Sequence, residues 1–395
     1  MGKHYELVIL GGGCAGLSLA MRLADFGHLA PTTLILEKRA GYSNDRTWCF
    51  WNEGNPALSD WVDHSWSNFQ IKNGNNSFTK SCKDTPYLMM SANTFYRKAI
   101  SKIALNKQRL TLMKNQNIVS VVKTHAKTWR ITTEECTFTT DKIVDTRPSK
   151  SINEKSSTLW QSFIGYEIEA QTNIFDKNQF VLMDFDERFT HGLGFIYVLP
   201  VSESRALIEY TVFSDKVVSA DRLKHYLNPA LKKYLKDVSY QTLRKEQGQL
   251  PMGNQKIKQS GDPSYIYAGL YAGSARPSSG YAFQRIQSWA EKCVTEIINH
   301  QPMMAPEKDV ATLTIMDDIF LSVLRSNAIK ENPNATITLF FNFFSRCRTK
   351  TVIRFLSDHA NSMDYLSIIT AMPKLLFLKA LPAYALKRLS NLKNG

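Results

Sequence analysis

The feature that most constrains the fold is a glycine-rich turn between an apolar run and a helical pattern at the start of the chain. The run 5–10 predicts a buried parallel strand, and residues 17–23 predict the helix that follows. Gly11, Gly13 and Gly16 fit the spacing G-x-G-x-x-G, which permits a tight turn, close backbone approach to a pyrophosphate and close helix packing. This unit predicts a nucleotide site in a doubly wound α/β domain; the simpler alternative is a structural turn.

An acidic residue strengthens the prediction of a nucleotide cofactor. A second strand, predicted at 32–36, ends at Glu37, about 20 residues after Gly16. A carboxylate at this place accepts hydrogen bonds from a ribose hydroxyl group. Strand, glycines, helix, second strand and acid in this order are a far stronger signal than the glycines alone.

A second glycine-bearing turn lies far away in the sequence. The apolar run 265–270 predicts another buried strand, and the turn after it contains Gly273 and Gly280 before a helix predicted at 282–299. Such a turn can offer N–H groups to a diphosphate or to a flavin ring, although it could be a plain surface loop. An NAD-only dehydrogenase usually keeps its nucleotide domain contiguous, so the separation of the two turns favours FAD.

Two further residues are candidates for cofactor binding. Arg46 follows the Glu37 strand closely, and Asp145 ends a predicted buried strand at 142–146, where it could contact the cofactor or cap a turn.

The middle of the chain alternates in the manner of antiparallel strands, notably at 180–185, 195–200 and 206–213. We therefore expect an α/β protein in which a Rossmann-like FAD-binding domain is interleaved with an antiparallel substrate-side sheet and followed by a helical C-terminal region. Helices are expected at 91–106 and 221–236, and residues 51–80 are expected to be irregular. The predicted limits are 1–60, 90–150 and 255–300 for the FAD-binding domain, 61–89 and 151–254 for the sheet domain, and 301–395 for the helical region.

Glu209 is the strongest candidate for acid–base chemistry. It lies in the middle of the apolar run 206–213, and strand alternation places Leu207, Glu209 and Thr211 on one face. If that face lines an apolar cavity, burial raises the pKa of the carboxyl group and keeps a proton ready for acid catalysis. The alternatives are a solvent-facing acid or an ion-pair partner of Arg205.

Aromatic residues are candidates for a substrate wall. Trp48, Phe50 and Trp51 could line a hydrophobic channel or hold a developing cation over their π faces, although an ordinary aromatic core is equally consistent. Tyr197 and Tyr210 are the other two candidates for this wall. The eight histidines show no spacing suited to a metal ion, so no metal site is expected.

The net charge of +14 calls for an explanation. No helix-turn-helix, RNP or zinc motif is visible, so a nucleic-acid partner is not expected. No acidic residue follows Asp364, whereas five basic residues are interleaved with Leu and Phe, namely Lys374, Lys379, Lys387, Arg388 and Lys393. This pattern suits either a segment on an anionic membrane face or a docked helix with a solvated basic side.

Cellular location is predicted from three absences in the sequence. The six scattered cysteines include no C-x-x-C pair, which predicts reduced thiols in a cytosolic protein. The first strand begins almost at Met1, which leaves no room for a signal peptide. No uninterrupted apolar stretch reaches 18 residues, so no spanning helix is expected.

The chain resembles the flavin-dependent lycopene β-cyclases of bacterial carotenoid synthesis over most of its length. The resemblance is carried by the glycine fingerprint and by segments 45–51, 144–148, 160–165, 197–200, 207–211, 246–252, 272–281 and 354–357. It implies redox-neutral closure of the ends of lycopene into β-rings, with reduced FAD as cofactor and NAD(P)H as its electron donor. The essential acid of the family maps onto Glu209, and Tyr210 stands where many relatives carry a second acid.

The resemblance also implies a partner and a location. Lycopene or another ψ-ended carotene is dissolved in the lipid bilayer, so we expect a protein bound to the cytoplasmic face of the cell membrane. Two rival functions remain open: an FAD-dependent monooxygenase or polyene reductase of the same fold, and a non-catalytic flavin-binding membrane partner.

Overall fold

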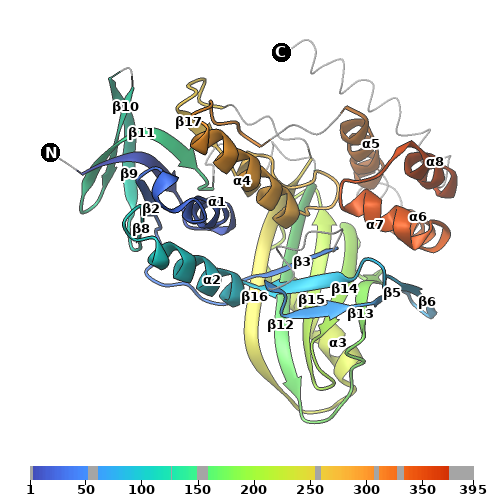
Figure 1. The fold of residues 1–395 in the computed structure, drawn as a ribbon. Coiled ribbons are helices and arrows are strands. Elements are labelled where there is room, and N and C mark those ends of the chain that lie inside the picture. The colour runs from blue at the N-terminus through green and yellow to red at the C-terminus, as the bar shows by residue number, and fades with distance from the viewer. Residues whose placement is uncertain are drawn as a thin grey trace.

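The computed structural model describes residues 3–51, 61–125, 127–148, 159–253, 259–306, 311–326 and 333–372. Figure 1 shows the N-terminal part, in blue and teal, on the left, a large green and yellow sheet below the centre, and the orange and red helices of the C-terminal part on the right. The chain is a mixed α/β protein, as expected from its sequence.

The first sheet carries the glycine turn. Its strand order is β8-β2-β1-β11-β10-β9, with β17 also paired to β11. Strand β1 pairs in parallel with β2 and β11, and β11 pairs in parallel with β17. Leu10 is in register with Leu36 and Asp145, and Asp145 with Tyr267, so four carboxyl ends meet at one edge. The strands are β1 (His4–Leu10), β2 (Thr33–Leu36), β8 (Leu110–Met113), β9 (Ile118–His125), β10 (Thr128–Thr133), β11 (Thr137–Asp145) and β17 (Tyr265–Tyr267).

Three helices share a core on this sheet: α1 (Cys14–Ala24), α2 (Ala92–Leu105) and α4 (Phe283–Ile298). Ser91 caps α2 by accepting a hydrogen bond from the backbone N–H of Thr94. Helix α4 packs against α1 although the sequence separates them widely, and Gln287 Nε2 donates to Ser18 Oγ at 2.9 Å. Segments from both ends of the sequence therefore build one layer.

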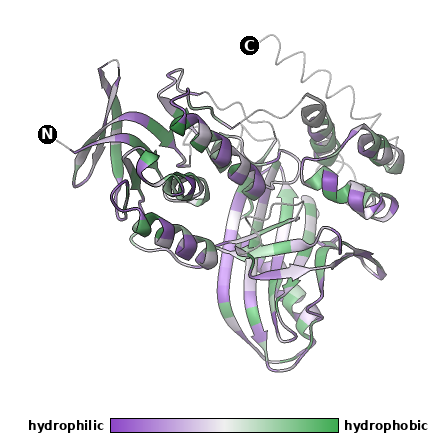
Figure 2. Cartoon of the chain, viewed as in Figure 1, coloured by the Kyte–Doolittle hydropathy of each residue, from purple (hydrophilic) through white to green (hydrophobic). Residues whose placement is uncertain are grey.

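The second sheet has the order β16-β12-β15-β14-β13-β5-β6. Its strands are β5 (Asn68–Asn73), β6 (Asn76–Ser81), β12 (Leu159–Ala170), β13 (Gln179–Asp186), β14 (Gly192–Pro200), β15 (Arg205–Ser214) and β16 (Tyr240–Met252). In Figure 2 the edge strand β16 is drawn largely in purple, whereas the inner strands β14 and β15 are richer in green. Helix α3 (Ala220–Leu235) covers one face of this sheet and encloses a core with Ile208 and Val212.

The opposite face of the second sheet packs against helices that follow α4. They are α5 (Ala311–Ser326), α6 (Pro333–Arg346), α7 (Thr349–Leu356) and α8 (Ser362–Ala371). Leu321, Phe340 and Phe343 lie in the same apolar cluster as Phe195 and Phe213 of the sheet. In the described ranges, no helix combines the length and the apolar character that a bilayer span needs.

The expectation that residues 51–80 are irregular was wrong for residue 51 and for residues 61–80, whereas residues 52–60 lie outside the described part of the chain. Among the described residues, this part contains β5 and β6 of the second sheet and β4 (His64–Trp66), which forms a small sheet with β7 (Tyr87–Ser91) and β3 (Thr47–Trp51). The polar run 73–76 misled the prediction because it is the hairpin turn between β5 and β6, with Gly74 at φ 58°. Phe69 and Ile71 alternate with polar residues and are fully buried, so long-range packing stabilises these strands.

The predicted domain limits stay predictions. The strands expected from the alternation in the middle of the chain are present, and so are the helices expected at 17–23, 91–106, 221–236 and 282–299. All six cysteines, each within the described part of the chain, are free thiols.

Candidate active site

One continuous cavity of about 1040 Å³ extends from the carboxyl edge of the first sheet to the inner face of the second sheet and the C-terminal helices. Gly11, Gly13 and Glu37 line it at the first sheet, and Leu207 and Glu209 line it at the second. The helices add an aromatic wall made of Phe320, Phe340, Phe343, Phe344 and Phe355. The cavity therefore joins the polar edge of the first sheet, which carries the glycine turn, to an apolar interior.

The glycine turn has the geometry that a phosphate cradle needs. Gly11 has φ +98°, a conformation that side chains with Cβ rarely adopt. A Cβ atom at Gly13 would meet no protein atom within 4 Å, so the space beside the first turn of α1 is open. Gly16 does not line the cavity; its missing side chain lets α1 pack against the carbonyl oxygen of Gly11.

Glu37 is held firmly at the same edge. Its Oε2 accepts a hydrogen bond from the N–H of Gly12 at 2.8 Å, and its Oε1 accepts from Arg39 Nε at 2.9 Å. Burial raises the pKa of Glu37, but the hydrogen bonds and charge of Arg39 outweigh it, so the pKa lies below its ordinary value. A charged acceptor therefore faces the cavity beside the turn.

Two of the expected cofactor residues lie outside the cavity wall. The side chain of Asp145 accepts hydrogen bonds from Arg147 and, at 2.7 Å, from the hydroxyl group of Tyr265, so it holds the turn from behind. Gly273 is solvent-exposed and does not line the cavity. Thr146 and Arg147, which follow Asp145, line the cavity instead.

The other two expected cofactor residues, Arg46 and Gly280, do line the cavity. Arg46 Nη1 donates hydrogen bonds to the carbonyl oxygens of Asp45 and Gln247. It thereby connects the segment before β3 to strand β16.

The aromatic candidates separate into two groups. Trp48 and Tyr197 line the cavity. Phe50 stacks on Phe283 at 5.0 Å between ring centroids, and Trp51 is buried against Tyr87 at 4.5 Å; neither lines the cavity.

The expectation that Tyr210 lines the substrate wall was wrong. Its ring stacks on Tyr226 of α3, with centroids 5.2 Å apart and the planes at 13°. Strand alternation explains the error, because Tyr210 points to the face opposite its neighbours Glu209 and Thr211.

Glu209 lies on the cavity wall, and Leu207, Thr211 and Phe213 share its face as strand alternation requires. The Thr211 hydroxyl group donates a hydrogen bond of 2.6 Å to Glu209 Oε1. Burial, followed by the charge of Glu246, raises the pKa of Glu209 to about 8. The carboxyl group is therefore neutral near pH 7 and able to donate a proton.

The simpler alternatives for Glu209 do not describe its surroundings. The side chain is 9% exposed, so it is not a solvent-facing acid. Arg205 Nε instead donates to Glu167 Oε1 at 2.7 Å.

A family model described as "Lycopene cyclase protein" matches residues 6–381, nearly the whole chain. The chain belongs to the lycopene cyclase family. A comparison with curated proteins finds no significant match.

Solved structures share the fold of this lycopene cyclase across most of its length. A geranylgeranyl bacteriochlorophyll reductase-like protein from Thermoplasma acidophilum is 14% identical with a TM-score of 0.65, and the match covers 95% of this chain and 98% of that one. A p-nitrophenol 4-monooxygenase from Pseudomonas putida DLL-E4 is 14% identical with a TM-score of 0.57, covering 96% and 99%. An aklavinone-11 hydroxylase solved with FAD and aklavinone is 13% identical with a TM-score of 0.54, covering 75% and 63%. At these identities the likeness concerns the fold alone.

The lycopene cyclase site contains residues that sequence reasoning did not select. They are Tyr87 and Tyr281, which form a chain of hydroxyl groups with the predicted wall residue Tyr197, with O–O distances of 2.9 and 3.0 Å. Tyr281 directly follows Gly280, so its place next to the second glycine-bearing turn could have indicated that it belongs to the site. Tyr87 lies on β7, whose contact with β14 is a tertiary feature without a local signal. Among the described residues, no cluster of His, Cys, Asp and Glu could hold a metal ion.

Proposed function

We propose that this lycopene cyclase is an FAD-dependent lycopene β-cyclase that converts the ψ-ends of lycopene or a related carotene into β-rings without net redox change. The observation that carries the proposal is the position of Glu209. It is a buried, proton-holding carboxyl group on the wall of a cavity that joins the glycine turn to an aromatic, apolar interior.

The residues at the glycine turn fit the diphosphate and ribose of FAD. The open space at Gly13 and the N-terminus of α1 suit a pyrophosphate, and Glu37 suits a ribose hydroxyl group. Gly280 would approach the cofactor from the second turn. Reduced FAD would supply electron density beside a developing cation, and NAD(P)H is the proposed source of its electrons.

The proposed chemistry balances within the carotene. Glu209 transfers its proton to a carbon of the terminal double bond, which leaves a tertiary carbocation. The next double bond attacks this cation, the six-membered ring closes, and loss of one proton from a neighbouring carbon gives the β-ring. The aromatic wall excludes water, which would otherwise capture the cation, and its π faces stabilise positive charge.

Pigment analysis in a lycopene-accumulating bacterium tests the proposal. The wild-type chain should produce carotenes with β-rings, and Glu209→Gln should not. In vitro, one anaerobic reduction of the flavin should support many turnovers.

Other outcomes favour the rival functions. If NAD(P)H oxidation matches product formation one to one, a monooxygenase or polyene reductase is favoured. Bound FAD without any turnover favours a non-catalytic flavin-binding membrane partner.

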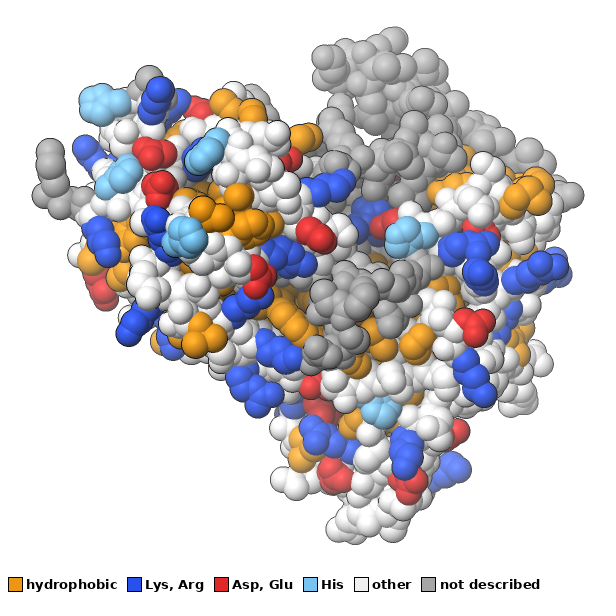
Figure 3. Space-filling view, viewed as in Figure 1, with side chains coloured by type: hydrophobic (Ala, Val, Ile, Leu, Met, Phe, Trp, Pro, Cys, Tyr) orange, Lys and Arg blue, Asp and Glu red, His pale blue; other side chains and the backbone are white. Residues whose placement is uncertain are grey.

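We also propose that the protein rests on the cytoplasmic face of the cell membrane, from which a carotene would enter. The basic segment from Lys374 onward lies outside the described residues. Directly before it, α8 exposes an apolar stripe of Met363, Leu366 and Ile369, and orange side chains gather over α8 in Figure 3. Met372, the residue after α8, lines the cavity, so the C-terminal end of α8 reaches the cavity wall.

On the face drawn in Figure 3, the charges of the described residues do not form a patch that indicates another partner. On the face shown in Figure 3, Lys and Arg are distributed among Asp and Glu rather than collected in one stripe.

A further inference from the structure

Gly165 stands between two acidic residues in the second sheet. It lies on β12, in register with Glu209 on β15 and with Glu246 on β16. The two outer strands are roughly 9–10 Å apart, because adjacent strands are separated by about 4.8 Å. Two glutamate side chains bridge such a distance only if the middle residue leaves the space between them free.

The missing side chain of Gly165 leaves this space. A Cβ atom there would lie 3.2 Å from Glu209 Cβ and 3.1 Å from Leu207 Cδ1. Phe163 is the next residue on this face of β12, and its ring covers Gly248 on β16. A Cβ atom at Gly248 would lie only 2.5 Å from Phe163 Cζ. The gap at Gly165 is therefore bounded by the side chain of Phe163 along β12. Glu209 and Glu246 lie on the two neighbouring strands, one on each side of the gap.

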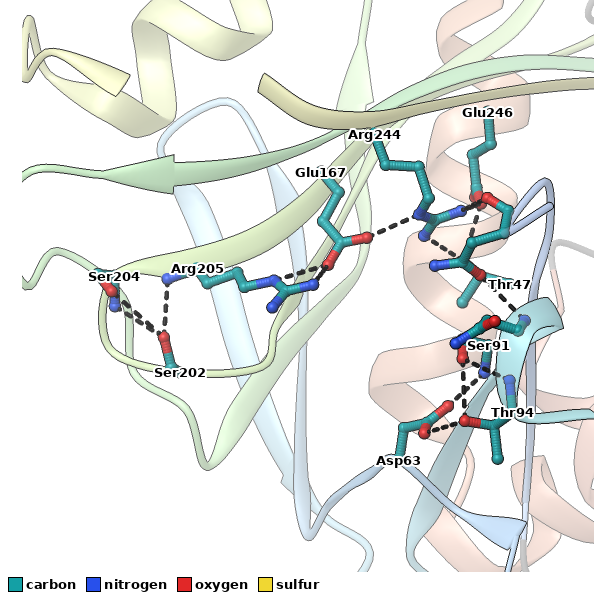
Figure 4. Close-up of polar contacts among 12 residues, drawn as sticks. Thr47, Asp63, Ser91, Thr94, Glu167, Ser202, Ser204, Arg205, Arg244 and Glu246 are labelled. Atoms are coloured by element: carbon teal, nitrogen blue, oxygen red, sulfur yellow. Dashed lines mark hydrogen bonds and ion pairs between the residues drawn. The ribbon is translucent and has the colours of Figure 1, made fainter. Parts of the chain in front are cut away.

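Glu246 is fixed on its own side by positive charge and a hydroxyl group. Arg244 forms an ion pair with it, and the Thr47 hydroxyl group donates to Glu246 Oε2 at 2.8 Å. Figure 4 shows Arg244 between Glu167 and Glu246, with contacts to both and to Thr47. These contacts fix the position of the Glu246 carboxyl group at the wall of the cavity.

Burial first, and then the charge of Glu246 across the gap, raise the pKa of Glu209. Both carboxyl groups line the cavity. Two carboxyl groups that face one cavity across a single strand, at a position without a side chain, can share one proton.

We propose that Glu209 and Glu246 form a proton-sharing carboxyl pair across β12, and that Gly165 and Glu246 are its positioning residues. The catalytic meaning of the pair rests on the proposed cyclase function, whereas its existence does not. It supplies from β16 the second carboxylate that Tyr210 cannot provide, because Tyr210 lies on the opposite face of β15.

The pair accounts for the proton through a whole turnover. When Glu209 protonates the alkene carbon, the pair carries two negative charges, which the carbocation and Arg244 balance. Ring closure leaves the positive charge on carbon, and the proton lost from the neighbouring carbon returns to the pair. One proton leaves and one returns, so the carotene is isomerised and the site is restored.

The pair is tested by titration of the resting protein. In wild type, infrared difference spectra should show a protonated-carboxyl band that disappears near pH 8 and is absent in Glu209→Gln. Glu246→Gln removes the neighbouring negative charge, so the band should titrate at a pH about one unit or more lower. Gly165→Ala should shift it in the same direction, because its Cβ displaces Glu209. The alkaline limb of cyclisation activity should move with the band.

Glu167→Gln is the matched control, because Glu167 is a buried acid paired to the same Arg244 but lies two residues along β12 from Gly165, the residue opposite Glu209. It should leave the midpoint of the band unchanged. The proposed pair is refuted if the midpoint of the band does not move in Glu246→Gln, or if it moves by the same amount in Glu167→Gln. Both results can be obtained even if Gly165→Ala fails to fold. A band that shifts as expected in a protein that never cyclises lycopene supports the pair and refutes the proposed function instead.

Discussion

At the scale of single residues, burial of Glu209 makes stability depend on pH. Its pKa rises from 4.5 to about 8 on folding, so the neutral form is favoured in the native state. The stabilising contribution is complete below pH 4.5 and is lost as pH rises to about 8, by about 1.4 kcal/mol per pH unit. Glu209→Gln should remove this slope, so urea unfolding from pH 5 to 9 should show the variant gaining stability relative to wild type. Parallel pH curves for the two proteins would contradict the burial of an ionisable group here.

Gly13 provides a second prediction at this scale. Its φ of −81° is open to any residue, and a Cβ there meets no protein atom, so Gly13→Val should fold with stability within about 0.5 kcal/mol of wild type. The added side chain occupies the proposed place of the pyrophosphate, so FAD binding measured by fluorescence should be lost. Gly41→Val is the control, because Gly41 has equally free space and does not line the cavity. Retained flavin in Gly13→Val would place the cofactor elsewhere.

At the scale of elements, a buried ion pair joins the second glycine-bearing turn to α5. Arg276 and Asp317 are both fully buried with N and O 3.1 Å apart, and the Ser278 hydroxyl group donates to Asp317. Asp317→Asn should cost about 3 kcal/mol of unfolding free energy, at the low end for a broken buried pair because Asp358 still faces the cation. Glu203→Gln, which breaks the exposed pair with Lys177, should cost no more than about 1 kcal/mol by the same denaturant titration. Equal costs would show that burial adds nothing to the Arg276 pair.

Elements were predictable from the sequence where their signal is local. The glycine turn, the face shared by Leu207, Glu209 and Thr211, and helices α2, α3 and α4 follow from spacing and periodicity. Strands β5 and β6 did not, because partners distant in sequence stabilise them. The same holds inside the site: Glu209 and Glu246 are aligned on either side of Gly165 only through the register of β15, β12 and β16, and no single-strand pattern reveals this. The sequence left the role of Asp145 open, because a polar residue at a strand end looks the same whether it faces a cofactor or supports the turn.

At the scale of the whole molecule, the apolar stripe of α8 and the basic tail should act together on a membrane. Replacing Leu366 and Ile369 with Asp, or neutralising the five basic residues after Asp364, should weaken sedimentation with anionic vesicles by at least about tenfold. The reason is that each basic residue contributes about 1 kcal/mol near such a surface. Val119 and Val122 are equally exposed on β9, which lies at the opposite end of the molecule in Figure 1, so their Asp variants should bind normally. If the β9 variants lose as much binding as the α8 variants, attachment is not localised to α8.

The cavity contains a single Glu209, and this has a consequence for the order in which rings are made. Under the proposed cyclase function, a linear carotene would bring one of its two identical ends to Glu209, and the far end would stay outside the cavity while the first ring forms. To close the second ring, the molecule must withdraw, reverse and enter again, now in competition with fresh linear substrate. The enzyme would thus be distributive: abundant lycopene would hold the product at one ring, and scarcity would drive it to two.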